Sequence, residues 1–260
     1  MPSVVTRVFE PVGFLFLRVF EETGRWFQML ARTASWAMRR PFEVREWLRQ
    51  MVRLGVDSIP VVFLTTMFTG MVMALQTFEG FRRVHAESFV ASVVSLSMVR
   101  ELSPVLVGLM VTGRVGSSMA AEIGTMRVTE QIDALEALAT NPIHYLFVPR
   151  VLAGIVMLPF LVVLGDAIGI FGGYLVAVKL LGANPVIYQQ NTWRFLDLND
   201  VWSGLIKAAV FGLLLTLTGC VKGYYTSGGA EGVGRSTTSA VVVASLLILL
   251  SDFFLTKILF

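Results

Sequence analysis

The sequence predicts an all-α polytopic membrane protein, and three observations point to that fold class. Hydrophobic residues make up 55% of the 260 residues, charged residues only 15%, and the mean hydropathy is +0.72. Several apolar runs approach the roughly 20 residues that a helix needs to cross a bilayer. These runs are continuous and lack the alternation of a β-barrel, the other structure that spans membranes.

Residues 1–56 are predicted to form an interfacial amphipathic helical segment. Arginines recur every seven residues along one helical stripe, and three tryptophans share another face: Arg18, Arg25, Arg32 and Arg39, then Trp26, Trp36 and Trp47. Such a helix suits the surface of a membrane, and Pro41 should divide it in two. A soluble helical domain or a DNA-binding arm is the alternative. The abundance of Trp, Phe and Leu beside the arginines favours the interface, so no nucleic-acid partner is expected.

Residues 57–260 are predicted to form a transmembrane domain with about five helices. The expected spans are about 57–80, 88–112, 146–181, 201–221 and 238–260. The third is too long for one perpendicular helix, so it must be tilted, bent at Pro159 or split. Residues 182–200 are expected to form a polar loop.

The positive charges predict the orientation of the chain. With the amino terminus in the cytoplasm, that side holds nine arginines before residue 57 and three from 114 to 150, together with Lys222 and Arg235. The other side holds five Lys or Arg residues, and Arg100 and Lys207 lie inside spans. A multi-pass protein with a cytoplasmic amino terminus is therefore predicted.

Three charges inside the membrane are the strongest candidates for a functional site. Arg100 and Glu101 lie in the second span and Lys207 in the fourth. Each costs about 2.5–3.5 kcal/mol at mid-bilayer, so Glu101 or Arg100 should meet Lys207 across a cavity. A buried pair that only fixes helix register is the alternative. Three charges without equal numbers of partners favour the cavity. Asp252 could serve a proton path, but no chain of acids and histidines accompanies it, so a packing or interfacial role is predicted.

A ladder of small residues leads into a short charged helix. Small residues at four-residue spacing form two neighbouring rows on this helix, which suits close packing in a bundle or a dimer. The first row is Gly108, Thr112, Gly116, Ala120 and Gly124, and the second is Gly113, Ser117 and Ala121. The helix that follows, about 125–138, has an apolar face and a charged remainder with Arg127, Glu130, Asp133 and Glu136. It should fit a groove on a cytoplasmic partner. An ordinary interfacial helix is disfavoured because the anionic inner leaflet repels acids.

Other chemistry is not expected on this chain. With one cysteine, Cys220, and two distant histidines, His85 and His144, neither a disulfide nor a metal site is predicted. Gly229 to Ser236 resembles a phosphate-binding loop but lacks its Lys and preceding strand. It is predicted to be a flexible cytoplasmic connection, without a nucleotide site.

The motifs along the chain resemble those of the MlaE-type permeases, the membrane subunits of maintenance-of-lipid-asymmetry ABC transporters. The matching segments are Arg100-Glu101-Leu102-Ser103-Pro104, Gly113 to Ser117, Ala121 to Met126, Thr129 to Glu136 and Pro149-Arg150. The resemblance implies a homodimeric, multi-pass permease in the bacterial inner membrane that moves phospholipids to periplasmic carriers and contributes to outer-membrane lipid asymmetry. It implies no catalytic residue, because ATP and Mg belong to a partner ATPase. Further implied partners are a STAS-domain subunit and a periplasmic MCE-domain hexamer.

The resemblance also implies roles for particular residues. Arg100, Glu101 and Lys207 would line a lipid cavity, with Met73, Phe81 and Leu102 as apolar contacts. The segment about 125–138 would be the coupling helix on the ATPase. Ser103 stands where the family commonly has Gly, which could alter packing near the cavity. An ion-coupled secondary transporter using Glu101 and Asp252, or a scaffold without transport, are the competing hypotheses.

Overall fold

The computed structural model describes residues 4–39, 43–83 and 85–259, with side chains described for Leu17 and from Phe20 onward. Helices occupy almost all of this part of the chain, and no strand occurs in it, which confirms the predicted all-α class. Five helical segments are long and apolar enough to cross a membrane: Val44–Arg82, Glu87–Val128, Ile143–Leu180, Leu198–Tyr224 and Gly229–Leu259. The five predicted spans are confirmed, and each lies within or close to one of these segments.

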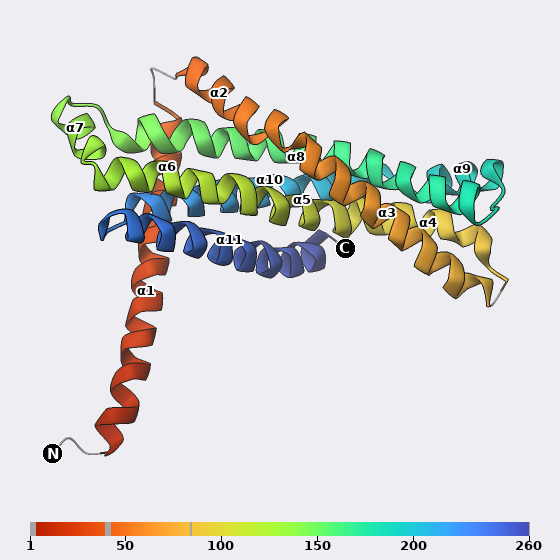
Figure 1. Cartoon of the computed structure of the whole chain (residues 1–260), viewed down its shortest axis with the longest axis horizontal. Coiled ribbons are helices and arrows are strands. Elements are labelled where there is room, and N and C mark those ends of the chain that lie inside the picture. Colours follow the sequence, from red (N-terminus) through yellow and green to blue (C-terminus); the bar gives the residue numbers. More distant parts are fainter. Residues whose placement is uncertain (1–3, 40–42, 84, 260) are drawn as a thin grey trace.

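The amino-terminal region consists of two helices with different surroundings. Helix α1 (Val4–Ala37) runs across the long axis of the bundle at the end where α7 lies, while α2 (Val44–Leu54) packs along α8 (Figure 1). Leu54 is fully buried in the core. The predicted break at Pro41 lies outside the described residues. The interfacial role of residues 1–56 stays a prediction, but α2 belongs to the packed bundle.

The first span follows α2 through a short 3-10 turn, η1 (Val56–Ser58), into α3 (Ile59–Arg82). The second is one long helical segment built from η2 (Glu87–Phe89), α4 (Val90–Ser97), α5 (Ser103–Val111) and α6 (Ser117–Val128). Two π-helical turns interrupt it, η3 (Met98–Leu102) and η4 (Thr112–Gly116). Turns of this kind occur often at functional sites, and η3 contains Arg100 and Glu101.

The predicted helix 125–138 is wrong in its bounds. Residues 125–128 end α6, and the charged helix α7 is shorter, Gln131–Ala137. The chain reverses at Glu130, whose φ of 60° is left-handed and unusual for a residue with a side chain. No Gly, Pro or Asn marks this turn. Asn141 and Pro142 begin the next segment, where the Asn141 carboxamide accepts a hydrogen bond from the Ile143 amide at 2.9 Å.

The third span is one unbroken helical segment, so of the three expected alternatives (tilt, bend at Pro159 or split) the split does not occur. It comprises the π-turn η5 (Ile143–Phe147), α8 (Val148–Tyr174), which contains Pro159, and the π-turn η6 (Leu175–Leu180). The predicted polar loop 182–200 is partly wrong. It contains α9 (Pro185–Arg194), which begins because the Asn184 side chain caps the amide of Val186 at 2.9 Å.

The last two spans are α10 (Leu198–Tyr224) and α11 (Gly229–Leu259). Asp197 and Asp200 form a capping box that fixes the start of α10. Residues 229–236 are the first turns of α11, so the predicted flexible connection is wrong. Gly228 and Gly229 supply the positive φ angles that the reversal before α11 needs.

Close backbone contact between helices holds the bundle together. A Cβ on Gly70 of α3 would lie 1.9 Å from the carbonyl oxygen of Gly169 on α8, and one on Gly212 of α10 would lie 2.2 Å from that of Gly154. Glycine permits this approach because it has no side chain. The first small row of α5 and α6 is buried and meets α10, whereas Gly113 of the second row is exposed.

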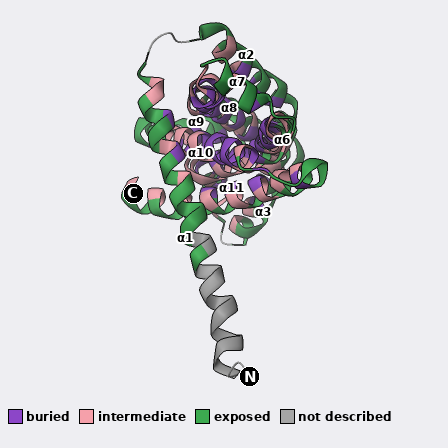
Figure 2. Cartoon of the chain, turned by 90° about the vertical axis from the view of Figure 1, so that its left-hand side faces the viewer, coloured by how far each residue is buried: buried purple, intermediate pink, exposed green. Residues whose placement is uncertain are grey.

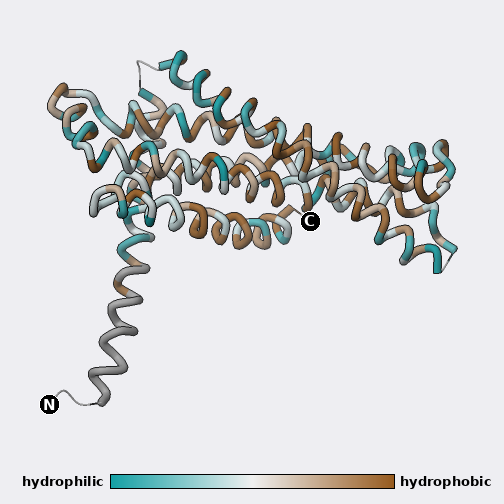
Figure 3. Tube along the Cα trace, viewed as in Figure 1, coloured by the Kyte–Doolittle hydropathy of each residue, from teal (hydrophilic) through white to brown (hydrophobic). Residues whose placement is uncertain are grey.

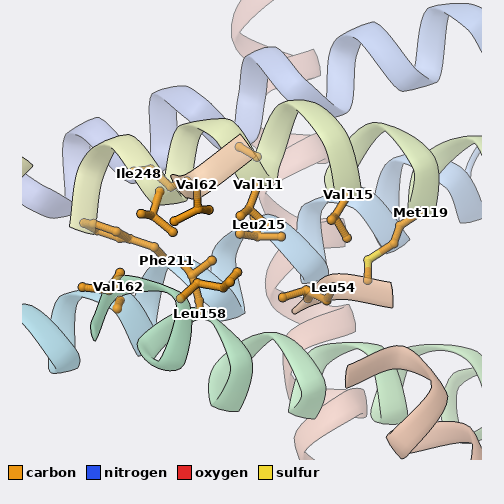
Figure 4. Close-up of a cluster of buried hydrophobic side chains, with 14 residues drawn as sticks. Leu54, Val62, Val111, Val115, Met119, Leu158, Val162, Phe211, Leu215 and Ile248 are labelled. Carbon is orange, nitrogen blue, oxygen red and sulfur yellow. The ribbon is translucent and has the colours of Figure 1, made fainter. Parts of the chain in front are cut away.

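Aliphatic and aromatic side chains from seven α-helices fill the centre of the bundle. Figure 4 shows Leu54, Val111, Leu158, Phe211 and Ile248 converging from different elements. Purple, buried positions concentrate on the helices at the centre of the end-on view (Figure 2). Long apolar stretches follow the spans, α11 most visibly (Figure 3), and large apolar side chains on it stay exposed, including Leu246 and Phe253. This distribution suits a lipid solvent or a second subunit.

Candidate functional site: a buried ion cluster

The amino group of Lys207 is the centre of an ion cluster among the second, fourth and fifth spans. Its side chain is completely buried. Nζ donates to Glu101 Oε2 at 2.7 Å, to Thr256 Oγ1 at 2.7 Å and to the Arg100 carbonyl oxygen at 3.0 Å. Asp252 Oδ1 lies 3.2 Å away. The predicted meeting of Glu101 with Lys207 is confirmed, and all three protons of the ammonium have acceptors.

Arg100 has a different partner, Asp200 at the start of α10. Its Nη2 lies 2.6 Å and its Nε 2.8 Å from Asp200 Oδ1. Asp200 is 2% exposed, and its other oxygen accepts from the Asp197 amide at 3.0 Å. One carboxylate therefore caps α10 and neutralises Arg100, so the arginine is tied to the amino-terminal end of the helix that carries Lys207.

The sequence-based argument from unequal charges is wrong. Arg100 and Lys207 face three acids, Glu101, Asp200 and Asp252, so every cation has a partner. Asp252, predicted to serve only packing or the interface, touches the ammonium group instead. Sequence reasoning missed Asp200 because it precedes the predicted span and reads as a loop residue. Its position as the third residue of a capping box was the available signal.

The backbone of η3 explains why Lys207 binds there. Pro104 has no N–H, so it cannot donate to the carbonyl of Arg100 four residues earlier, as a regular helix requires. The Lys207 ammonium donates to that carbonyl instead. The proline thus creates an acceptor inside the membrane span, where polar groups need partners within the protein. Pro104 and Lys207 are complementary features of two helices.

The cluster is open on one side. The side chains of Arg100 and Glu101 are 39% and 38% exposed, whereas Lys207 is fully enclosed. Lys207 therefore holds the site together, and Arg100 and Glu101 present a guanidinium and a carboxylate outward. Removing one partner of such a buried pair typically costs about 3–5 kcal/mol because the other charge stays uncompensated.

The three predicted apolar contacts share one neighbourhood. Met73, Phe81 and Leu102 are partly buried and pack against a single core cluster that includes Phe78, Val90, Met98 and Tyr188. Leu102 follows Glu101 in the same π-turn. This cluster lies toward the α9 end of the bundle, so Leu102 joins the ion cluster to an apolar region. Their contact with acyl chains stays a prediction.

The predicted partner-binding residues lie at the opposite, α7 end. Ile132 is fully buried and anchors α7, while Glu130, Asp133 and Glu136 are exposed. Arg127 belongs to α6 rather than to the charged helix. Its Nη1 lies 2.6 Å from Asp133 Oδ1 and its guanidinium lies 5.7 Å from the Tyr224 ring centroid. The acids of α7 are therefore held outward on a short, fixed helix.

A second ion network joins the helices near the α7 end. Glu122 of α6 lies 3.2 Å from Arg150 Nη2 of α8 and 3.3 Å from Arg53 Nη1 of α2. Arg114 donates to the Arg53 carbonyl oxygen at 2.7 Å. Arg150 is 3% exposed, and no pattern in the sequence indicates its burial. The network ties α6, which leads into α7, to α2 and α8.

A helical membrane protein with a polar cluster between its spans and a short acidic helix at one end has the architecture of a transport permease. Known proteins of similar sequence belong to the same class. Residues 47–258 match the family described as Permease MlaE. A probable ABC transporter permease of Rickettsia felis is 49% identical over 96% of each chain. The intermembrane phospholipid transport permease MlaE of Haemophilus influenzae is 38% identical over 82% of each. The chloroplast protein TRIGALACTOSYLDIACYLGLYCEROL 1 of Arabidopsis thaliana is 40% identical, over 83% of this chain and 62% of its own.

The chain belongs to the MlaE family of ABC transporter permeases. Its five long apolar helical segments, together with this family, identify it as an integral membrane subunit.

Proposed function

We propose that this permease moves phospholipids between the bacterial inner membrane and periplasmic carrier proteins, and so contributes to the lipid asymmetry of the outer membrane. The observation that supports this most is the open side of the ion cluster. Arg100 and Glu101 present opposite charges beside the apolar neighbourhood of Leu102. A phospholipid offers the matching pattern, a phosphate with a charged or polar headgroup on one side and acyl chains on the other.

Each residue has a defined part in this proposal. Arg100, held by Asp200, contacts the lipid phosphate, and Glu101, held by Lys207, contacts a cationic or hydroxyl headgroup. Met73, Phe81 and Leu102 contact the acyl chains. Lys207 acts through Glu101 and the Arg100 carbonyl, because its own ammonium is enclosed. When no lipid is bound, Asp200 compensates the charge of Arg100 and Asp252 compensates that of Lys207. Keeping these charges in the membrane therefore costs little free energy.

The energy source is a partner ATPase that carries the ATP and Mg. In our proposal its groove receives α7 together with the preceding residue Glu130, and the exposed acids Glu130, Asp133 and Glu136 fit a basic surface. The α7 end is then cytoplasmic, in line with the positive-inside rule. The permease itself has no catalytic residue. A STAS-domain subunit and a periplasmic MCE-domain hexamer complete the assembly.

We propose that the permease is a homodimer. Support comes from the exposed apolar side chains of α11, among them Leu246, Leu249 and Phe253, and from the exposed second small row at Gly113. Apolar faces of this kind are energetically neutral in lipid, so close packing through small residues would supply the specificity.

A second candidate function, an ion-coupled secondary transporter, is favoured by one observation. Two carboxylates, Glu101 and Asp252, share the Lys207 ammonium, which is an arrangement that can exchange a proton. Reconstitution separates the two. Lipid transfer in vesicles that depends on the ATPase and ATP supports the ABC function. Lipid transfer driven by a proton gradient without an ATPase contradicts it, and a chain that binds neither ATPase nor lipid is a scaffold.

A further inference from the structure

A cavity at the α7 end lies apart from the ion cluster. It has a volume of about 840 Å³ and is lined by α1, α10 and α11, including Arg25, Trp26, Lys222, Arg235, Val243 and Leu247. This α1–α10–α11 cavity is separated from the ion cluster along α10. Lys222 follows Lys207 by 15 residues, or about 22 Å at 1.5 Å per residue. The two regions are therefore different sites.

The lining changes from apolar to cationic along both spans, and in the same direction. On α10 it passes from Leu214 through Thr218 to Lys222, and on α11 from Leu247 through Ser239 to Arg235. The two helices are antiparallel, so the sequence order differs but the spatial order agrees. The cationic end lies toward α7 and the apolar end toward the middle of the spans. Trp26, on the crossing helix α1, bonds to Thr218 through Nε1 at 3.1 Å and forms one wall.

The cations of the lining come from three separate elements. Lys222 Nζ lies 2.8 Å from Glu22, the one acid in the lining. The Arg25 guanidinium stacks 4.8 Å from the centroid of the Tyr225 ring and also pairs with Glu21 one turn away. Arg235 lies 3.6 Å from Glu231, and both are largely exposed. The Arg25–Glu21 and Arg235–Glu231 pairs each lie on one exposed helix and are therefore weak. Arg25 and Arg235 can thus bind an anion at little cost, and Lys222, which Glu22 holds from α1, adds a third positive charge beside them.

We propose that the α1–α10–α11 cavity binds an anionic phospholipid of the leaflet at the α7 end. The phosphate contacts Lys222, Arg25 and Arg235, and an acyl chain follows Leu214, Val243 and Leu247. The hydroxyls of Thr218 and Ser239 lie between these parts, where a lipid carries its ester groups. The inference rests on the lining of this cavity and not on the proposed transport, and it requires no movement of the lipid.

The test uses the purified full chain in detergent and native mass spectrometry. The chain is titrated with phosphatidylglycerol, phosphatidylcholine or inorganic phosphate. Phosphatidylglycerol should bind, and Lys222→Gln and Arg235→Gln should each weaken it about tenfold or more, since each removes a charge-assisted contact. The matched control Arg82→Gln/Lys257→Gln removes two exposed charges outside the cavity and should leave binding unchanged.

A second variant keeps the charges and fills the space. Ser239→Trp should abolish phosphatidylglycerol binding, whereas Leu249→Trp, on an exposed part of the same helix, should not. Size-exclusion chromatography of each variant checks that it is folded. Binding that Ser239→Trp and the two cation variants leave unchanged overturns the proposal. Equal affinity for phosphatidylcholine, or displacement of the lipid by inorganic phosphate, also overturns it.

One further outcome identifies another occupant. If phosphatidylglycerol does not bind and Ser239→Cys forms a disulfide with a second copy, the cavity is an interface between subunits. Glu101→Gln, at the ion cluster, should not alter phosphatidylglycerol binding in this cavity. Failure at one site is therefore distinguishable from failure at the other.

Discussion

Replacing Lys207 with Met should destabilise the protein more than any other single change of charge among the described spans. Met preserves most of the volume but removes the ammonium that Glu101, Asp252, Thr256 and the Arg100 carbonyl share. Two carboxylates then face each other without a cation. Breaking a buried pair costs about 3–5 kcal/mol. Because Glu101 is 38% exposed, solvent can relieve part of this, and about 3 kcal/mol is expected.

The loss can be measured by thermal unfolding of the purified chain in detergent. For a chain of this size each 1 kcal/mol corresponds to roughly 2–4 °C in Tm, so Lys207→Met should lower Tm by about 6–12 °C. Lys257→Met, which removes an exposed ammonium from the neighbouring turn of α11, should change the free energy of unfolding by less than about 1 kcal/mol. The double variant Lys207→Met/Glu101→Gln should recover part of the loss, because it removes one of the two opposed charges.

The double variant tests whether Lys207 and Glu101 interact. If the effects of Lys207→Met and Glu101→Gln simply add, the two side chains do not interact as described. A Tm of Lys207→Met equal to that of the unaltered protein would refute the claim that this ammonium is buried and essential to the cluster.

Three other predictions concern transport, coupling and packing. Glu101→Ala should impair lipid transfer in reconstituted vesicles while the protein keeps its elution volume on size-exclusion chromatography, and full transfer would exclude a role for this carboxylate. Reversing Glu130, Asp133 and Glu136 to Lys should detach the ATPase in co-purification. Reversing Glu79 and Glu87, at the other end of the bundle, should not detach it. If the first variant retains the ATPase, α7 is excluded as its binding site. Gly212→Ala should lower the free energy of unfolding by about 3 kcal/mol or more through overpacking, because its Cβ would lie 2.2 Å from the Gly154 carbonyl oxygen. Gly113→Ala, in open space, should be tolerated. Equal Tm values for the two variants would contradict the close packing of α8 and α10.

The sequence predicted the spans and part of the ion cluster well. Hydropathy determines the spans because lipid excludes unpaired polar groups. The same cost of a charge in lipid predicted that Glu101 or Arg100 meets Lys207, and Glu101 does so, 106 residues apart in sequence. The close packing of the row from Gly108 to Gly124 was also readable, since close approach requires small residues at four-residue spacing.

Other features depend on contacts that a linear pattern does not contain. Asp200 and Asp252 join the cluster only because α10 and α11 bring them beside the second span. The end of α6 at Val128 has no Gly or Pro signal, and Glu130 adopts a left-handed φ without one. Residues 229–236 look like a loop from their glycines, yet they form the start of α11. In each case tertiary packing overrides local propensity.

The most direct test of the proposed function is covalent capture of the lipid beside the ion cluster. A photoreactive residue at Leu102, in a permease reconstituted with its ATPase, should form phospholipid adducts detectable by mass spectrometry, and ATP turnover should reduce them. The same residue at Val163, an exposed position on α8, should capture bulk lipid regardless of ATP. Adducts at Leu102 that match those at Val163 in composition and do not respond to ATP would contradict a lipid-binding role for Arg100 and Glu101.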